Sequence, residues 1–268
     1  MRVTIPSFEK KAALFSYLKE NKKTLIQQKK SMPIFSDVCK SAIVQTKDTN
    51  LNTKGVTEVT EDLDVLRVKV VANTANWLDS HLDVLLPDAS SKSINERKGI
   101  IPHLHDHQHT IEAKVGEVHD IMNTTLTLRE LGIDKDGTTQ ALVFITDIIK
   151  DYNEKVFNQY KKGFANQHSI GLQYVKLDLA LNDEDSTEEY KVWNSYINQV
   201  INRDKAEQYG FFWAVKEFKL IENSVVLFGS NEITPTLDNN MKTEPLSHSD
   251  IKNEPSNDTR KNKYLHLL

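Results

Sequence analysis

A serine within an alternating segment is the first candidate for chemistry. Residues 164–175 alternate apolar and polar side chains with the period of a β-strand, and Ser169 lies at their centre. Gly171, two residues later, leaves open space on the same face of that strand. A serine hydroxyl becomes a nucleophile when a neighbouring base accepts its proton, and a carboxylate usually orients that base. The rest of the chain must therefore supply a histidine and a carboxylate.

Four histidines at alternate positions are candidate bases. His103, His105, His107 and His109 share one parity, so an extended backbone places their imidazoles on one face. One interpretation makes His105 the general base for Ser169. A second makes two or three of them, among His103, His105 and His107, ligands of a metal such as zinc, although no cysteine cluster or HExxH helix accompanies them. A third is a histidine-rich strand end without a catalytic role.

A carboxylate on an apolar strand face is the third candidate. Glu222 shares its parity with the large apolar residues at 218, 220, 226 and 228. A buried carboxylate is costly unless it is paired, and a histidine is a suitable partner because the carboxylate fixes its tautomer. The alternative is a β-bulge that turns Glu222 toward solvent. Ser169, a histidine and Glu222 could thus form a hydrolytic triad, provided that the fold brings them together.

The elements that must position these groups are mostly strands. Besides the strand that carries Ser169, alternation predicts strands from about residue 63, at 84–86, 114–119, 123–130, 140–149 and 211–229. Helical spacing predicts a basic amphipathic helix over 8–30, a short helix or loop over 89–98, a helix opened by Asp151 and Glu154 and ended by Gly163, and an inserted helix at 186–206. We expect the basic helix to pack on the domain by one apolar stripe, with docking to a partner or an anionic surface as the alternative.

Composition limits the class of protein. The 268 residues carry a net charge of −4, so no global basic field indicates nucleic acid, and no apolar run is long enough to cross a bilayer. Cys39 is the only cysteine, which excludes an intramolecular disulfide framework and fits a reducing compartment. We expect a cytosolic protein with a helix and polar linker at 1–60, a catalytic domain at 61–236 and a disordered polar tail at 237–268.

Four short motifs follow one another along the chain: Pro102-His103-Leu104-His105-Asp106, Lys114-Val115-Gly116-Glu117-Val118, His168-Ser169-Ile170-Gly171-Leu172 and Leu220-Ile221-Glu222-Asn223-Ser224-Val225-Val226. In this order they resemble the motifs of the caudoviral prohead proteases, the tailed-phage serine peptidases of capsid maturation, which are similar in fold to the herpesvirus assemblins. The resemblance covers residues 63 to 236. The chain departs from the family pattern in the extra histidines around His105, in Asn223 where valine is common, in the inserted helix, and in Gly229-Ser230-Asn231 in place of Pro-Ala.

The resemblance implies an α+β fold, namely an assemblin-like closed β-barrel surrounded by helices. It implies Ser169 as nucleophile, His105 as general base and Glu222 as third member, without a cofactor. It also implies a homodimer that cleaves scaffolding protein or the scaffold-like arm of the major capsid protein inside the prohead, in the host cytoplasm, and that trims its own polar ends; neither nucleic acid nor membrane is an expected partner. Two alternatives stay open: a metal-dependent hydrolase built on the histidines at 103–109, and a non-enzymatic capsid-assembly or scaffold module.

Overall fold

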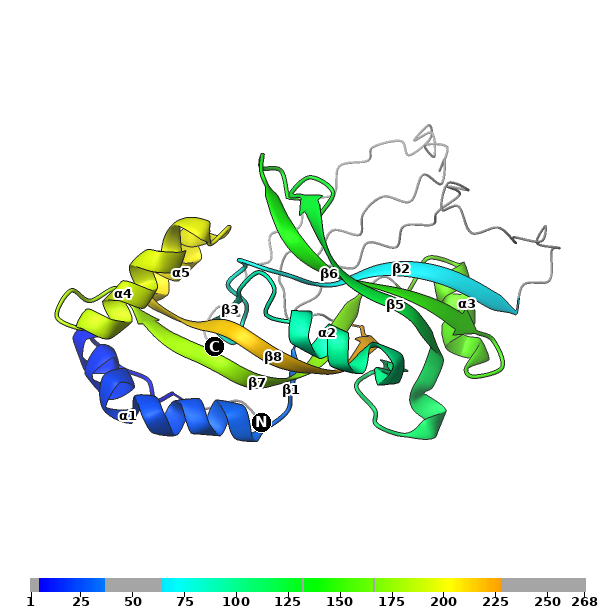
Figure 1. Ribbon diagram of the computed structural model, residues 1–268, viewed down its shortest axis with the longest axis horizontal. Coiled ribbons are helices and arrows are strands. Elements are labelled where there is room, and N and C mark those ends of the chain that lie inside the picture. The colour runs from blue at the N-terminus through cyan, green and yellow to red at the C-terminus, as the bar shows by residue number, and fades with distance from the viewer. Residues whose placement is uncertain (1–4, 37–63, 132, 166, 228–268) are drawn as a thin grey trace, which may run out of the picture.

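The computed structural model describes residues 5–36, 64–131, 133–165 and 167–227. They form a mixed α+β fold around one sheet (Figure 1), so the predicted α+β class is confirmed. The strands are β1 (Ile34–Ser36), β2 (Val65–Thr74), β3 (Asp83–Leu85), β4 (His103–His105), β5 (Lys114–Thr127), β6 (Thr138–Ile149), β7 (His168–Leu181) and β8 (Phe211–Val225). The helices are α1 (Lys11–Ser31), α2 (Ser91–Arg97), α3 (Glu154–Lys161), α4 (Thr187–Tyr196) and α5 (Arg203–Tyr209), with 3-10 turns at Lys98–Ile100, Ile111–Ala113 and Ile197–Gln199.

The sheet follows an open path. Its strand order is β1-β7-β8-β4-β5-β6-β2, and β3 pairs with β8 beside this path. Strands β7 and β8 are antiparallel and long, whereas the three-residue β4 runs parallel to the end of β8 and joins it to β5. In the described part of the chain no pairing joins the end strands β1 and β2, so the expected closed barrel is not found there.

Helix α2 covers the middle of one edge of β8. Between the short partners β3 and β4, it takes the place of a neighbouring strand. The Ser93 hydroxyl accepts a hydrogen bond from the Leu220 N–H at 2.8 Å, and Arg97 Nε donates to the Leu220 carbonyl at 3.1 Å. Side chains of α2 therefore satisfy backbone groups of β8 that neither short strand pairs.

The predicted elements are recovered with four local differences. Strand β1 (Ile34–Ser36), which pairs with β7, lies within the segment predicted as a polar linker. The segments predicted as two strands at 114–119 and 123–130 form one strand, β5, with a bulge between Val118 and Asp120. The inserted helix is divided into α4 and α5 by a 3-10 turn and an extended Val200. Helix α3 is capped by Asn153, whose side chain accepts the Val156 N–H at 3.1 Å, rather than by Asp151. Most of the linker and the tail predicted at 237–268 lie outside the described residues.

Helix α1 belongs to the main core. It runs along β7 (Figure 1), and Leu18 and Leu25 on its inner face are fully or almost fully buried in the same cluster as the sheet residues. The interpretation of α1 as a helix packed by one stripe is therefore confirmed. Near its end, the ammonium of Lys29 lies 2.7 Å from Asp83 Oδ1, and both side chains are buried. No helix among the described residues combines the length and the apolar character needed to span a membrane.

A glycine permits the close contact between β5 and β6. A Cβ atom added at Gly116 would lie 2.3 Å from the backbone oxygen of Asp147 on β6. A side chain at this position would therefore push the two strands apart. Gly116 also pairs with His103 of β4, so its small size helps to set where β4 lies against the sheet.

Candidate active site

The register of three strands places the candidate nucleophile and carboxylate on one face. Ser169 of β7 is directly opposite Ser224 of β8, Gly171 is opposite Glu222, and Ser224 is in turn opposite Leu104 of β4. Side chains of directly opposed residues on neighbouring strands lie on the same side of a sheet. Ser169 is 1% exposed, and within the described chain its hydroxyl has no hydrogen-bond partner. The sheet thus holds a buried, unengaged hydroxyl beside the Glu222 position.

Glu222 is paired with an imidazole, and that imidazole is His107. His107 Nδ1 lies 2.7 Å from Glu222 Oε1, and the carboxylate is completely buried whereas the His107 side chain is 18% exposed. The second carboxylate oxygen accepts a hydrogen bond of 2.5 Å from the Ser224 hydroxyl. That hydroxyl accepts the backbone N–H of His107 at 3.2 Å. Glu222 therefore points inward and is paired, so the solvent-facing bulge considered from the sequence does not occur.

A tight turn after β4 delivers His107 to this position. Asp106 and His107 both adopt left-handed backbone conformations, with φ of 50° and 53°. Aspartate and histidine tolerate this region better than most residues, yet each such residue costs about 1–3 kcal/mol. Hydrogen bonds from the Asp106 N–H to the Val225 carbonyl at 2.9 Å and from the Gln108 N–H to the His105 carbonyl at 3.1 Å hold the turn. The turn ends the strand alternation, so His107 does not follow the parity of His103.

The structure places His105 on the opposite face of the sheet from Ser169. In the register, His103 lies opposite Asn223 and His105 opposite Val225, which puts both on the face away from Ser169. The side-chain partner of His105 is its neighbour Asp106, at 3.4 Å. The histidine that contacts Glu222 is two residues later than the one assigned from the sequence. His107, rather than His105, is therefore the candidate for the general base.

The alternative metal site is not assembled. His103 lies in the core, His105 contacts Asp106, and His107 contacts Glu222, so the three imidazoles do not converge. Within the described ranges, no group of three or more histidine, cysteine, aspartate or glutamate side chains could hold a metal ion. The parity argument failed because it assumed that the whole segment 103–109 is extended.

Two buried histidines and a tyrosine lie behind the nucleophile. The Tyr160 hydroxyl of α3 is 2.6 Å from His168 Nε2 and 3.2 Å from His103 Nε2, and all three side chains are buried. Burial lowers the pKa of His103 to about 3, and burial together with the nearby His103 holds the pKa of His168 well below its usual value. A hydroxyl can donate to one imidazole and accept from another. Tyr160 therefore bridges the neutral rings of His168 and His103. It thereby links β7, at the residue before Ser169, to β4, which precedes the turn that carries His107.

Comparisons with known proteins were made at three levels. No family model, curated protein or solved structure matches this chain. The resemblance to the prohead proteases remains one of short motifs in a fixed order. Ser169 and Glu222 lie within two of these motifs, and His107 directly follows a third.

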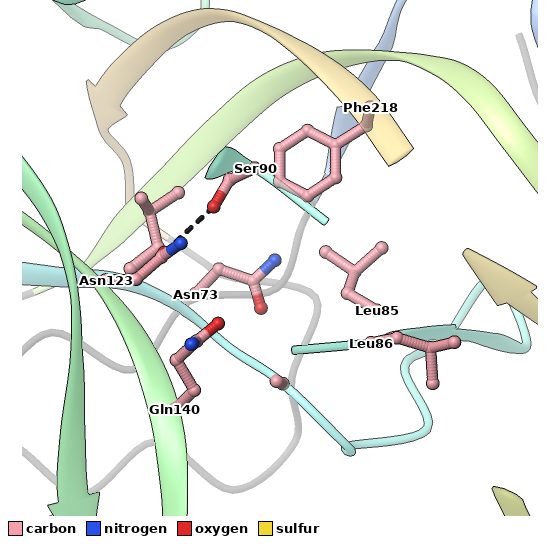
Figure 2. Close-up of a pocket in the computed structure, with 9 residues that line it drawn as sticks. Asn73, Leu85, Leu86, Ser90, Asn123, Gln140 and Phe218 are labelled. Carbon is pink, nitrogen blue, oxygen red and sulfur yellow. Dashed lines mark hydrogen bonds between the residues drawn. The ribbon is translucent and has the colours of Figure 1, made fainter. Parts of the chain in front are cut away.

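A small hollow lies away from the candidate active site. It is bounded by strands β2, β5 and β6 and by the start of α2, with the amide of Asn73 at its centre (Figure 2). Ser90 Oγ donates to Asn123 Oδ1 at 2.8 Å on its wall, while Asn73 Nδ2 has no hydrogen-bond partner among the described residues. Its volume of about 20 Å³ accommodates one water molecule. This hollow is therefore suited to a structural water rather than to a substrate.

Proposed function

We propose that the protein is a serine endopeptidase in which Ser169 is the nucleophile, His107 the general base and Glu222 the carboxylate that orients the base. One observation carries the proposal: His107 Nδ1 lies 2.7 Å from the buried Glu222 carboxylate, on the sheet face that bears Ser169. A carboxylate in this position fixes the imidazole tautomer and stabilises the imidazolium that forms when serine loses its proton.

The roles follow from the direction of the imidazole. Because Nδ1–H donates to Glu222, Nε2 is the nitrogen that accepts the Ser169 proton as the hydroxyl oxygen attacks the peptide carbonyl. The C–N bond then breaks, Nε2 returns the proton to the leaving amine, and an acyl-enzyme remains on Ser169. Water, deprotonated by the same nitrogen, hydrolyses the ester. Since Ser169 is 1% exposed, the side chains that cover it must move aside when a peptide binds.

The second serine on this face has a different role. Ser224 donates its hydroxyl proton to Glu222 and accepts the N–H of His107, so both its donor and an acceptor position are occupied. It acts as a positioning residue that keeps the carboxylate and the His107 turn together. Ser169, whose hydroxyl is unengaged among the described residues, is the better nucleophile candidate.

The substrate class in this proposal comes from the motif order. The prohead proteases, which the chain resembles, act on scaffolding protein or on the scaffold-like arm of the major capsid protein inside the precursor shell. We extend the same class to this protein, with trimming of its own termini, a homodimeric state and action within the prohead in the host cytoplasm. His107 lies one residue beyond the Pro102–Asp106 motif, so the proposed base differs from His105, which the resemblance implies.

Co-expression with the capsid and scaffolding proteins tests the function. Intact masses are measured for all proteins after expression with the wild type and with Ser169→Ala. We expect truncated scaffold, or a truncated capsid-protein arm, with the wild type only, because alanine removes the nucleophile and little volume. Equal truncation by both forms would refute the proposal, and if a chelator abolished that truncation, a metal-dependent hydrolase would replace it. Association with the capsid protein without any truncation would favour the assembly module.

A further inference from the structure

A groove opens directly beside the His107–Glu222 pair. Its apolar walls are the side chains of Pro102, Leu104, Ile111 and Ile221, and the polar residues His109, Thr110, Lys114 and Glu222 complete its lining. The volume of about 570 Å³ falls within the range of about 300–1,000 Å³ that is usual for ligand sites. The groove is therefore large enough for several atoms of a peptide, whereas the hollow beside Asn73 is not.

The strand register places one wall of this groove on the same sheet face as the candidate active site. Leu104 lies opposite Ser224, and Ser224 lies opposite Ser169, so Leu104 is on the same sheet face as the nucleophile. Glu222 belongs to both the groove and the His107 pair. A peptide whose carbonyl lies over Ser169 would therefore place a neighbouring side chain in the groove.

The chemistry of the walls selects the kind of side chain. Ile111 is 89% exposed, although isoleucine is usually buried, and it lines the groove together with Pro102, Leu104 and Ile221. The one lysine of the lining is already engaged, since Lys114 Nζ is 2.5 Å from Glu117 Oε1. An aliphatic side chain that covered Ile111 and Leu104 would remove apolar surface from water, which favours binding.

We propose that the groove lined by Leu104, Ile111 and Ile221 is the specificity subsite of the peptidase and takes an aliphatic side chain near the scissile bond. This inference rests on the proposed function. The substrate segment it selects is an extended peptide with leucine, isoleucine, valine or methionine at one fixed position relative to the cleaved bond.

A profile of cleavage sites tests the subsite. A pooled library of synthetic peptides is digested with the full-length wild type, with Ile111→Asp and with Ile100→Asp, and the products are identified by mass spectrometry. Ile100 is also exposed, at 67%, but it lies outside this groove. We expect an aliphatic preference at one position in the wild type and in Ile100→Asp, and at least a tenfold loss of cleavage at those sites in Ile111→Asp.

A second readout separates this inference from the proposed function. A small fluorophosphonate reacts with an activated serine without occupying the groove, so its labelling of Ser169 should be equal in the wild type and in Ile100→Asp. Absence of labelling in the wild type would count against the peptidase itself. Labelling at Ser169 combined with no aliphatic preference, or with a preference that survives Ile111→Asp, would overturn the subsite alone.

Discussion

The buried pair of imidazoles behind Ser169 should make the stability of the protein fall in mild acid. His103 is fully buried and its pKa is lowered from 6.5 to about 3 by burial. In the unfolded chain the same imidazole is protonated below about pH 6.5. The unfolded state therefore binds more protons between pH 6.5 and 3, so stability is present above pH 6.5 and is lost progressively as the pH falls through this window.

The size of the effect follows from the two pKa values. At pH 5 the unfolded imidazole is about 1.5 pH units below its pKa, and each unit corresponds to about 1.4 kcal/mol, so His103 alone should remove about 2 kcal/mol between pH 7.5 and 5. Replacement by a residue that does not titrate removes this contribution. His103→Gln should therefore lose about 2 kcal/mol less than the wild type between these two pH values, whatever its absolute stability.

Urea unfolding followed by circular dichroism at pH 7.5 and pH 5 measures this difference. The matched control is His119→Gln, because His119 is exposed and its removal should leave the wild-type pH dependence unchanged. The difference between variants isolates the contribution of His103 from those of other groups. One of these is Asp79, whose pKa is raised to about 8 by burial and by the neighbouring Asp83, so its contribution to stability changes with pH in the opposite direction. An equal loss of stability in His103→Gln and the wild type would refute the buried neutral imidazole.

Three further predictions concern other contacts of the structure. Lys29→Met should destabilise the protein by about 3–5 kcal/mol in urea unfolding, because it leaves the buried Asp83 carboxylate without its cation. The double variant that also carries Asp83→Asn should recover most of this loss of stability. If the double variant recovered none of it, the pairing would be contradicted. Gly116→Ala should cost about 1–3 kcal/mol in the same assay, since its Cβ would meet the Asp147 carbonyl, and an unchanged midpoint would argue against that close approach. Ser224→Ala should lower the cleavage rate in the co-expression assay about ten- to a hundredfold while leaving some activity, because the hydrogen bonds to Glu222 and from the His107 N–H, each of about 1–1.5 kcal/mol, are lost. Complete loss would give Ser224 a larger role than positioning.

The strands of the candidate site could be predicted from the sequence because each has a clear period. The alternation around Ser169 correctly predicted a strand, and the parity of Glu222 with its apolar neighbours correctly placed that carboxylate on a buried face. The open space expected beside Ser169 is not found, since the side chain is 1% exposed. Helix α1 was equally predictable, since its apolar residues keep a helical spacing over the 21 residues of a lysine-rich segment. These segments are long enough for one pattern to dominate.

The base could not be assigned from alternation alone. Strand β4 has three residues, and the left-handed pair Asp106 and His107 then reverses the chain, so the parity that joined His105 to His107 has no structural meaning. Two adjacent non-glycine residues at positive φ give little sequence signal. The open path of the sheet was missed because the closed barrel was an implication of the motif resemblance, and the pairing of distant strands leaves no periodic signal in the sequence.

Reaction with a fluorophosphonate tests most directly whether His107, held by Glu222, activates Ser169. The labelled residue is mapped and the labelling rate is measured for the wild type, His107→Gln and His105→Gln. We predict that the label is on Ser169, that His105→Gln keeps a rate close to wild type, and that His107→Gln is slower by at least about a hundredfold, which is the usual contribution of a general base. A label on Ser224, or a rate that survives His107→Gln but is lost in His105→Gln, would contradict the account.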